Sequence, residues 1–382
     1  MSFQALKKGE KGLLKSLLLF DKKRGDAFIP LTVILVAVFG LFMVYSASYY
    51  TAETTLNDKY FYLKKQLIGF LFGLTGMLFF SFFNYKKLLK IKTPLLIISI
   101  ILLALVFTPL GVENYGAKRW IGVGSITIQP SEIAKFAFII FTAGYFYKNV
   151  NRTQTFKGIL PVILVGLTLC LLIMLEPNMS ITVCLGALFL TMLYSSGVKL
   201  KYVIIILLPL IALVPILILV EPYRLKRLLA FINPWESPKG EGYQLIQSLY
   251  ALGRGGFTGV GYLNSVQKYR FLPFAESDFI LSVIGEEFGL IGVITMFLVD
   301  IFLIWRGFKT AIRCKNYFGY LLAIGITFIY AVQVGVNALV VTGSIPPTGL
   351  PLPLISAGNT SLIVFMSAFG ILHSISKDCD AI

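Results

Sequence analysis

Long apolar runs alternate with short polar loops along most of the chain. Most runs approach the ~20 residues that a helix needs to cross the ~30 Å hydrocarbon core of a bilayer. A membrane β-barrel would instead alternate apolar and polar residues one by one. The pattern therefore predicts an all-α integral membrane protein. Its ten transmembrane helices are predicted roughly at 28–47, 66–83, 94–110, 130–147, 158–175, 179–196, 202–220, 278–304, 317–341 and 361–376.

Three connections between these helices are long. The longest, 221–277, joins the seventh and eighth spans, and loops of that length are usually functional. Residues 111–129 form a second, and 343–360 form a third. Prolines and glycines in the third forbid regular helix and predict a partly re-entrant hairpin that lines a cavity. The predicted organisation is a tail at 1–27, a ten-span membrane domain at 28–376 and a tail at 377–382.

The composition supports a membrane protein and orients it. The chain is 57% hydrophobic and 14% charged, with a mean hydropathy of +0.82 and a net charge of +16. Soluble globular proteins carry about 25% charged residues. A charge of +16 on a soluble protein would suggest nucleic acid, but here Lys and Arg flank alternate spans, as cytoplasmic loops do. We therefore predict a multi-pass protein of the cytoplasmic membrane, with both termini cytoplasmic and no nucleic-acid partner. The basic groups lie at 7–24, 86–92, 148–157, 199–201, 306–315 and 377.

Histidine and cysteine offer little chemistry. The one histidine, His373, lies near the predicted inner end of the last span, and the four cysteines show no zinc-site or disulfide spacing. Histidine-based catalysis on an outer face is therefore excluded.

Ionisable residues inside predicted spans mark the next candidates, because each costs at least about 2.5 kcal/mol at the bilayer midplane. Glu132 and Lys135 share one helix face at i, i+3 spacing. They either line a cavity or form a local ion pair. Glu286 and Glu287 are adjacent, about 100° apart on a helix, so we predict that they cannot both face one site.

The densest polar chemistry lies at 243–292, which joins the long loop to the eighth span. Gln247 and Ser248 sit in a short amphipathic segment, and Asp278 opens the span. A glycine cluster between them matches neither phosphate-loop pattern, so we predict that it packs against the membrane or a lipid head group. The cluster comprises Gly253, Gly255, Gly256, Gly259 and Gly261.

Basic residues in the long loop depart from the simple inside bias. Arg224, Arg227 and Lys268 either hold a phosphate or pyrophosphate, or were translocated with a long loop regardless of charge.

Six stretches together resemble the SEDS family, which contains FtsW, RodA and SpoVE. The resemblance covers nearly the whole chain after residue 28 and is closest to the FtsW/SpoVE branch. The stretches are LFMVYSAS, KRWIGVGSITIQPSEIAK, RLKRLLAFINPW, GYQLIQSLYALGRGGFTGVGYLNSVQKYRFLP, SDFILSVIGEEFGLIG and GLPLPLISAGNTSL.

The resemblance implies a ten-span inverting peptidoglycan glycosyltransferase. Such enzymes polymerise lipid II, an undecaprenyl-pyrophosphate-linked disaccharide-pentapeptide, on the outer membrane face. They work with a class B penicillin-binding protein in division, elongation or sporulation. The family's essential aspartate falls on Asp278, which we therefore expect to be the general base, with a helix N-cap as the alternative. We expect the substrate-binding residues to be Lys118, Arg119, Glu132, Lys135, Arg224, Arg227, Gln247, Ser248, Lys268, Glu276, Glu286 and Ser356.

The chain differs from the family's motifs at two positions. The family reads LPE-x-h-T-D-F where this chain has Phe274 for the glutamate and Glu276 two positions later. It reads PD-x-G-T where this chain has Asn178 for the aspartate.

A divalent cation, Mg²⁺ or Mn²⁺, could assist at the pyrophosphate. A lipid II flippase and a non-catalytic scaffold for the penicillin-binding protein are the rival functions.

Overall fold

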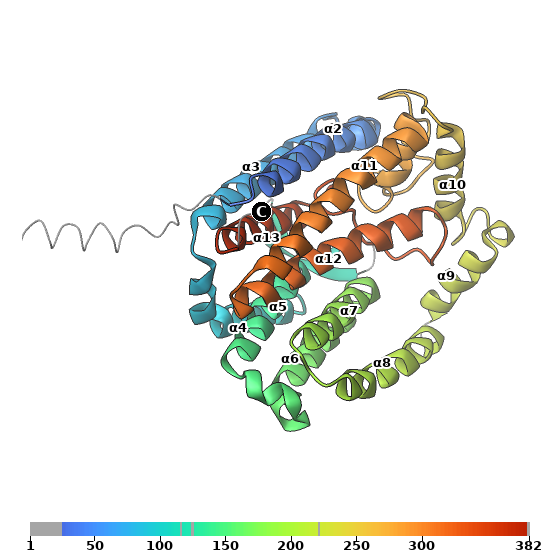
Figure 1. The fold of residues 1–382 in the computed structure, drawn as a ribbon. Helices are drawn as coiled ribbons and strands as arrows, with labels where there is room; N and C mark the ends of the chain where they lie inside the picture. The colour runs from blue at the N-terminus through green and yellow to red at the C-terminus, as the bar shows by residue number, and fades with distance from the viewer. Residues whose placement is uncertain (1–24, 115–116, 124–125, 221, 380–382) are drawn as a thin grey trace, which may run out of the picture.

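A computed structural model describes residues 25–114, 117–123, 126–220 and 222–379. The predicted basic residues of the N-terminal tail up to residue 24 lie outside these ranges. The described chain is mostly helical (Figure 1). Each of the ten predicted spans overlaps one long helix. These helices are α2 Phe28–Leu56, α3 Phe61–Phe82, α4 Leu88–Leu105, α5 Pro130–Lys148, α6 Phe156–Leu175, α7 Met179–Ser195, α8 Leu200–Val220, α11 Ile280–Arg313, α12 Tyr317–Val341 and α13 Asn359–Ser376.

Seven helices among the described residues are long and apolar enough to cross a membrane. They make the chain a multi-pass membrane protein. The seven are α2, α3, α4 with the short turn before it, α6, α11, α12 and α13. Helix α7 and the first part of α8 are apolar but shorter. Helix α5 is not among them, and it carries the Glu132 and Lys135 side chains.

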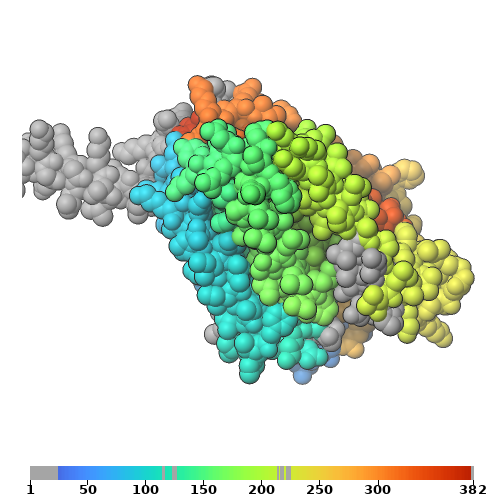
Figure 2. Space-filling model, turned by 90° about the horizontal axis from the view of Figure 1, so that it is seen from below, coloured from blue at the N-terminus to red at the C-terminus, as the bar shows by residue number. Residues whose placement is uncertain are grey.

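Helices α12 and α13 occupy the centre of the bundle. Helix α13 packs along α3, and α12 packs against α5, α7 and α11 (Figure 1). Gly69 and Gly73 of α3 permit the close approach, since a Cβ on Gly73 would lie 2.6 Å from Met366 Sδ of α13. Small residues serve this purpose at helix contacts in membranes. Helix α8 lies at the periphery, where α7 and α9 are its neighbours, while α4 and α6 lie side by side on the face in Figure 2.

Two of the long connections contain regular structure. Residues 111–114, 117–123 and 126–128 form a three-stranded antiparallel sheet of β1 Gly111–Asn114, β2 Ala117–Val123 and β3 Ile126–Ile128, in the order β1-β2-β3. The all-α prediction missed this sheet because its strands are very short. The long loop contains α9 Pro222–Ile232, a 3₁₀ turn at Pro234–Glu236 and α10 Tyr243–Gly255, which packs on α11.

Helix α11 is interrupted at Gly289, whose φ of 64° and ψ of −168° suit glycine alone. In an unbroken helix, the Leu290 and Ile291 amides would donate to the carbonyls of Glu286 and Glu287. Here the backbone of the preceding loop forms hydrogen bonds with all four of these groups, the two amides and the two carbonyls. The hydrogen bonds are Leu290 N to Gly256 O at 2.9 Å, Ile291 N to Phe257 O at 3.1 Å, Val260 N to Glu286 O at 3.0 Å and Gly261 N to Glu287 O at 3.0 Å.

This inserted loop corrects the prediction for two members of the glycine cluster. Gly255 and Gly259 pack on the backbone of α11, not on a lipid head group. A Cβ on Gly255 would overlap the Gly285 carbonyl, and one on Gly259 would overlap the Glu287 carbonyl. The glycines therefore let one backbone approach another.

The segment 343–358 contains no regular helix, as its prolines predicted. It is buried in the protein: Leu350, Leu352 and Ile355 are each at most 2% exposed. Its carbonyl groups accept hydrogen bonds from side chains of the bundle. Asn337 Nδ2 donates to Leu350 O at 2.7 Å, and Gln66 Nε2 donates to Ser356 O at 3.0 Å.

Candidate functional site

Asp278 lies where the long loop meets α11, on a backbone held from two sides. Asn337 of α12 donates to the Asp278 carbonyl at 2.8 Å. Ser356 Oγ donates to Ser277 O at 2.6 Å, and Ala357 N donates to Glu276 O at 2.8 Å. The N-cap position of α11 is Phe279, with no side-chain cap. The N-cap alternative for Asp278 is therefore wrong in this structure.

The Asp278 carboxylate has no partner among the described residues. It forms no hydrogen bond or ion pair with any residue in the described ranges. It lies beside Gly349, whose φ is +69° and where a Cβ would come within 3.3 Å of Asp278 Oδ2. A glycine at this position keeps the approach to the carboxylate open.

Burial and two guanidinium groups shift the pKa of Asp278 in opposite directions. Burial raises the pKa of Asp278 to about 6, against the lowering effect of Arg119 and Arg227, and Glu276 raises it further. Arg119 Nε and Nη2 donate to the carbonyls of Glu176 at 3.3 Å and Pro177 at 2.6 Å. An aspartate with this pKa is mostly ionised at pH 7, yet it holds a proton better than a free aspartate does.

The second guanidinium comes from α9, and the nearby carboxyl comes from the loop. Arg227 Nη1 donates to Pro347 O at 3.4 Å. Burial raises the pKa of Glu276. The structure thus brings together four of the predicted residues, Asp278, Arg119, Arg227 and Glu276, and supports their backbone with a fifth, Ser356.

Glu176 belongs to this neighbourhood and was missed. It follows α6, its side chain is fully buried, and neither carboxyl oxygen has a partner among the described residues. Burial raises the pKa of Glu176 to about 8, opposed by Arg119. The available signal was an acidic residue at the end of an apolar run, two positions before Asn178.

Glu132 and Lys135 form the ion pair that their spacing allowed. Lys135 Nζ lies 2.8 Å from Glu132 Oε1, and the side chains are 0% and 1% exposed. The Lys135 ammonium also lies 5.4 Å from the centre of the Phe365 ring on α13. That this pair serves the same cavity as Asp278 stays a prediction.

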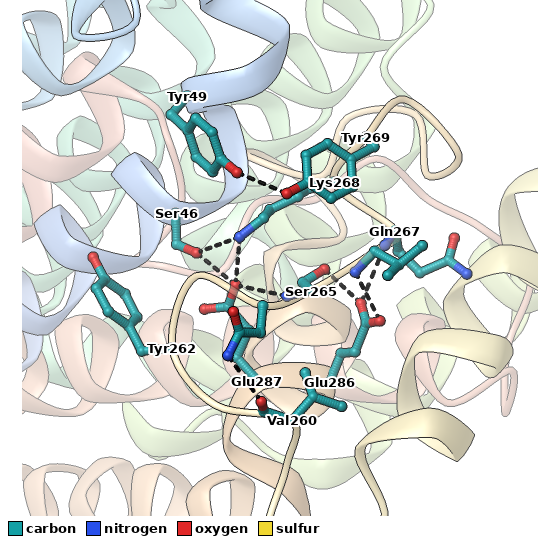
Figure 3. A network of polar contacts seen from close by, with 12 residues as sticks. Ser46, Tyr49, Val260, Tyr262, Ser265, Gln267, Lys268, Tyr269, Glu286 and Glu287 are labelled. Atoms are coloured by element: carbon teal, nitrogen blue, oxygen red, sulfur yellow. Dashed lines mark hydrogen bonds and ion pairs between the residues drawn. The ribbon is translucent and has the colours of Figure 1, made fainter.

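Glu286 and Glu287 both face the loop 265–268, so the prediction that they could not share a site is wrong (Figure 3). The loop curves around the end of the first half of α11, and long glutamate side chains reach it from both positions. Glu286 accepts from Ser265 Oγ at 2.5 Å, Val266 N at 3.0 Å and Gln267 N at 3.3 Å. Glu287 Oε1 accepts from Ser46 Oγ at 2.6 Å, Lys268 Nζ at 3.0 Å and Ser265 N at 3.3 Å.

Lys268 is consequently engaged inside the protein. It is 1% exposed, its ammonium pairs with Glu287, and it lies 4.9 Å from the centre of the Tyr49 ring. In this structure Lys268 and Glu286 are not open to a phosphate, which corrects their predicted role in binding substrate.

The comparison with known families decides the relationship. A family model described as "Cell cycle protein", covering FtsW, RodA and SpoVE, matches residues 26–380. The chain belongs to this family.

Relatives of the family resemble the chain over most of its length. It is 40% identical over 353 residues to the probable peptidoglycan glycosyltransferase FtsW of Trichlorobacter lovleyi, covering 92% of this chain and 93% of that one. It is 36% identical over 359 residues to the stage V sporulation protein E of Bacillus subtilis, covering 93% and 98%. The predicted placement in the FtsW/SpoVE branch is confirmed.

Solved structures share the fold. One, described as the structural coordination of polymerization and crosslinking by a peptidoglycan synthase complex, matches with a TM-score of 0.75 and 26% identity over 93% of this chain and 98% of that one. The rod shape determining protein RodA of Thermus thermophilus matches with a TM-score of 0.67 and 23% identity over 93% and 97%, which shows the fold alone.

The two departures from the FtsW/RodA/SpoVE pattern have local structural roles. Asn178 is the N-cap of α7, and its Oδ1 accepts from Ile181 N at 3.3 Å, a role that Asn and Asp both fill. Phe274 lines an open pocket of about 180 Å³ beside Arg227. The other lining residues are Gly240, Glu241, Tyr243, Gln244, Pro273 and Pro347.

The remaining predicted residues lie apart from Asp278 or are structural. Ser248 is buried and bonds Ser282 Oγ at 2.8 Å and Val341 O at 2.7 Å, which joins α10, α11 and α12. Gln247 is half-buried in α10, and Lys118 is exposed in β2. The side chain of Arg224 lies outside the described part of α9.

Proposed function

We propose that this protein is a peptidoglycan glycosyltransferase that polymerises lipid II on the outer face of the cytoplasmic membrane, in division, elongation or sporulation. Family membership and the names of the relatives support the reaction class. The observation that carries the proposal is the Asp278 carboxylate, which has no partner in the described part of the chain, has a raised pKa and is close enough to interact electrostatically with Arg119 and Arg227.

Glycan extension needs a base and an anion-binding group. Asp278 takes the proton from the 4-hydroxyl of the acceptor sugar as that oxygen attacks the donor. Arg119 and Arg227 stabilise the pyrophosphate that leaves, because guanidinium groups bind phosphate oxygens in a bidentate manner. Attack opposite an α-linked pyrophosphate gives a β-1,4 bond, so the reaction inverts the configuration.

A divalent cation stays an expectation of the proposal. Mg²⁺ is often bound through one or two carboxylates together with substrate phosphates, and Asp278 with Glu276 offers two carboxylates close enough to interact. No group of three or more His, Cys, Asp or Glu residues in the described chain could hold a metal by itself. When bound, such an ion would add positive charge at the pyrophosphate.

We further propose ten membrane spans, with both termini cytoplasmic and residues 221–277 outside. The basic loops support this orientation, and the helix found at each predicted span supports the number of spans. A cysteine placed at Ser237, which follows the 3₁₀ turn in the long loop, should react with a membrane-impermeant thiol reagent in intact protoplasts. Labelling that requires lysis would reverse the topology.

The proposed partner is a class B penicillin-binding protein, together with other division or elongation proteins. The resemblance implies it, and a relative of known structure is described as part of a peptidoglycan synthase complex. The described residues contain no soluble domain that could cross-link peptides. Co-purification of a transpeptidase from native membranes is expected, whereas a fully active protein that always isolates alone would argue against an obligatory partner.

Purified protein with lipid II in detergent tests the function directly. Detergent has no leaflets, so a flippase produces nothing measurable there, and a scaffold adds no polymerase activity of its own. We expect long glycan strands on a gel that resolves polymer length. Lipid II left unchanged by folded protein, with and without Mg²⁺ and the partner, would reject the proposal.

A further inference from the structure

The cluster of Lys268, Glu286 and Glu287 has no part in the chemistry above, yet it is among the most extensively bonded polar groups of the described chain. We call these three side chains, with the loop 265–268 that they hold, the carboxylate clasp (Figure 3). The Lys268–Glu287 ion pair is fully buried on both sides. Arg254 adds a contact of 3.4 Å to Glu286 from α10.

Both glutamates stand on a rigid base. Their carbonyl groups accept the inserted Val260 and Gly261 amides at 3.0 Å each. The broken helix at Gly289 therefore fixes the backbone that carries the clasp as well as the side chains that close it. Ser46 of α2, which contacts both Glu287 and Lys268, connects the clasp to a second helix.

The clasp closes a ring that contains Asp278. The chain runs from Lys268 through Asp278 into the first half of α11 and reaches Glu287, where the ion pair returns it to Lys268. Between them, Leu272 and Ala275 are each 3% exposed, so this side of the ring is packed against the protein. A change at the clasp has few ways to relax other than by moving the segment that holds Asp278.

We propose that the carboxylate clasp positions Asp278, with Lys268, Glu286 and Glu287 acting as positioning residues. Removing one charge leaves its partner buried and uncompensated, which forces the loop to open toward water. The direction of Asp278 between Arg119 and Arg227 is then lost. This inference rests on the proposed function for its kinetic consequence, but its structural consequence can be measured without any substrate.

The test uses the full-length purified protein with Lys268→Gln, Glu287→Gln and the double variant. A displacement of about 1 Å at a reacting group can cost ~100-fold in rate, so each single variant should polymerise lipid II 10- to 100-fold more slowly per folded molecule. The double variant removes both charges and keeps hydrogen-bond donors and acceptors. It should return to within about threefold of wild type.

A further readout separates positioning from general stability. Amide hydrogen exchange of a peptide covering 269–279 should accelerate in the single variants, while Tyr317–Val341 of α12 exchanges as before.

Arg306→Gln is the matched control. Arg306 forms another buried ion pair on α11, with Asp26 at 2.5 Å, at the opposite end of the helix. It should lower the thermal midpoint without changing exchange at 269–279 or activity per folded molecule. Lys268→Gln behaving like this control would overturn the inference. If wild-type protein were inactive on lipid II, the proposed function would fail, and unchanged exchange at 269–279 would still decide against the clasp.

Discussion

The first half of α11, from Ile280 to the break at Gly289, carries carboxylates at both ends with opposite surroundings. At its start, the Asp278 carboxylate has no described partner and a raised pKa. At its end, Glu286 accepts three hydrogen bonds and an ion pair. Desolvating a charge costs free energy unless partners offset it. A carboxylate with partners therefore anchors the loop, and one without partners is left for chemistry.

The largest expected effect comes from removing the unpartnered carboxylate. Asp278→Asn keeps the shape of the side chain but cannot take a proton, so polymerisation should fall ~10²- to 10⁴-fold. The protein should stay folded, since Asp278 neither caps α11 nor pairs with a described residue. The measurement is the initial rate of lipid II consumption per folded molecule.

Glu276→Gln is the control for that variant. Glu276 is close enough to raise the pKa of Asp278, so its loss should change the rate by less than tenfold. An inactive Glu276→Gln beside an active Asp278→Asn would transfer the role of base to Glu276.

Glu132 is a paired carboxylate inside the bundle, so removing its partner should lower the stability of the protein. Lys135→Met leaves Glu132 charged and buried, which costs about 3–5 kcal/mol of folding free energy. The thermal midpoint in detergent should fall by several degrees, and Glu132→Gln together with Lys135→Met should restore it. If the Glu132–Lys135 pair also contributes to the Asp278 site, the double variant should polymerise lipid II slowly even though its stability is restored. Normal activity in that stable double variant would make the pair structural alone.

The positions of the helices could be predicted from the sequence, because apolar runs of membrane length leave few alternatives. The candidates Asp278, Arg119 and Arg227 came from the resemblance and the loop charges. The contacts of Lys268, Glu286 and Glu287 could not be predicted, because they depend on residues far apart in the sequence. Whether Lys268 faces a phosphate or Glu287 depends on how residues 256–268 fold back over α11, and that path is made possible by Gly289. The adjacency of Glu286 and Glu287 was misleading because one curved loop reaches both.

The burial of Glu176 is another property that could not be predicted from the sequence. It is fully buried without a partner, a fact that no local pattern reveals. Its folded pKa of about 8 exceeds its ordinary 4.5. Its contribution to stability is therefore full below about pH 4.5 and is lost as the pH rises through 8.

Glu176→Gln should give the smallest effect of the series. At pH 9 the variant should melt a few degrees above wild type, because the buried charge is gone, and at pH 4.5 the two should differ little. Thermal midpoints at the two pH values measure this. A midpoint difference between variant and wild type that is the same at pH 4.5 and pH 9 would show that Glu176 finds a partner on ionisation.

The most direct test of the account is the pH dependence of lipid II polymerisation by the purified protein. The rate should rise with pH on the acid side with a midpoint near 6, the pKa that burial gives Asp278, and then reach a plateau, because only the ionised carboxylate accepts the proton. Asp278→Asn should stay at background across the whole range. An acid midpoint near 4, or the same midpoint retained in Asp278→Asn, would contradict the assignment of Asp278 as the base.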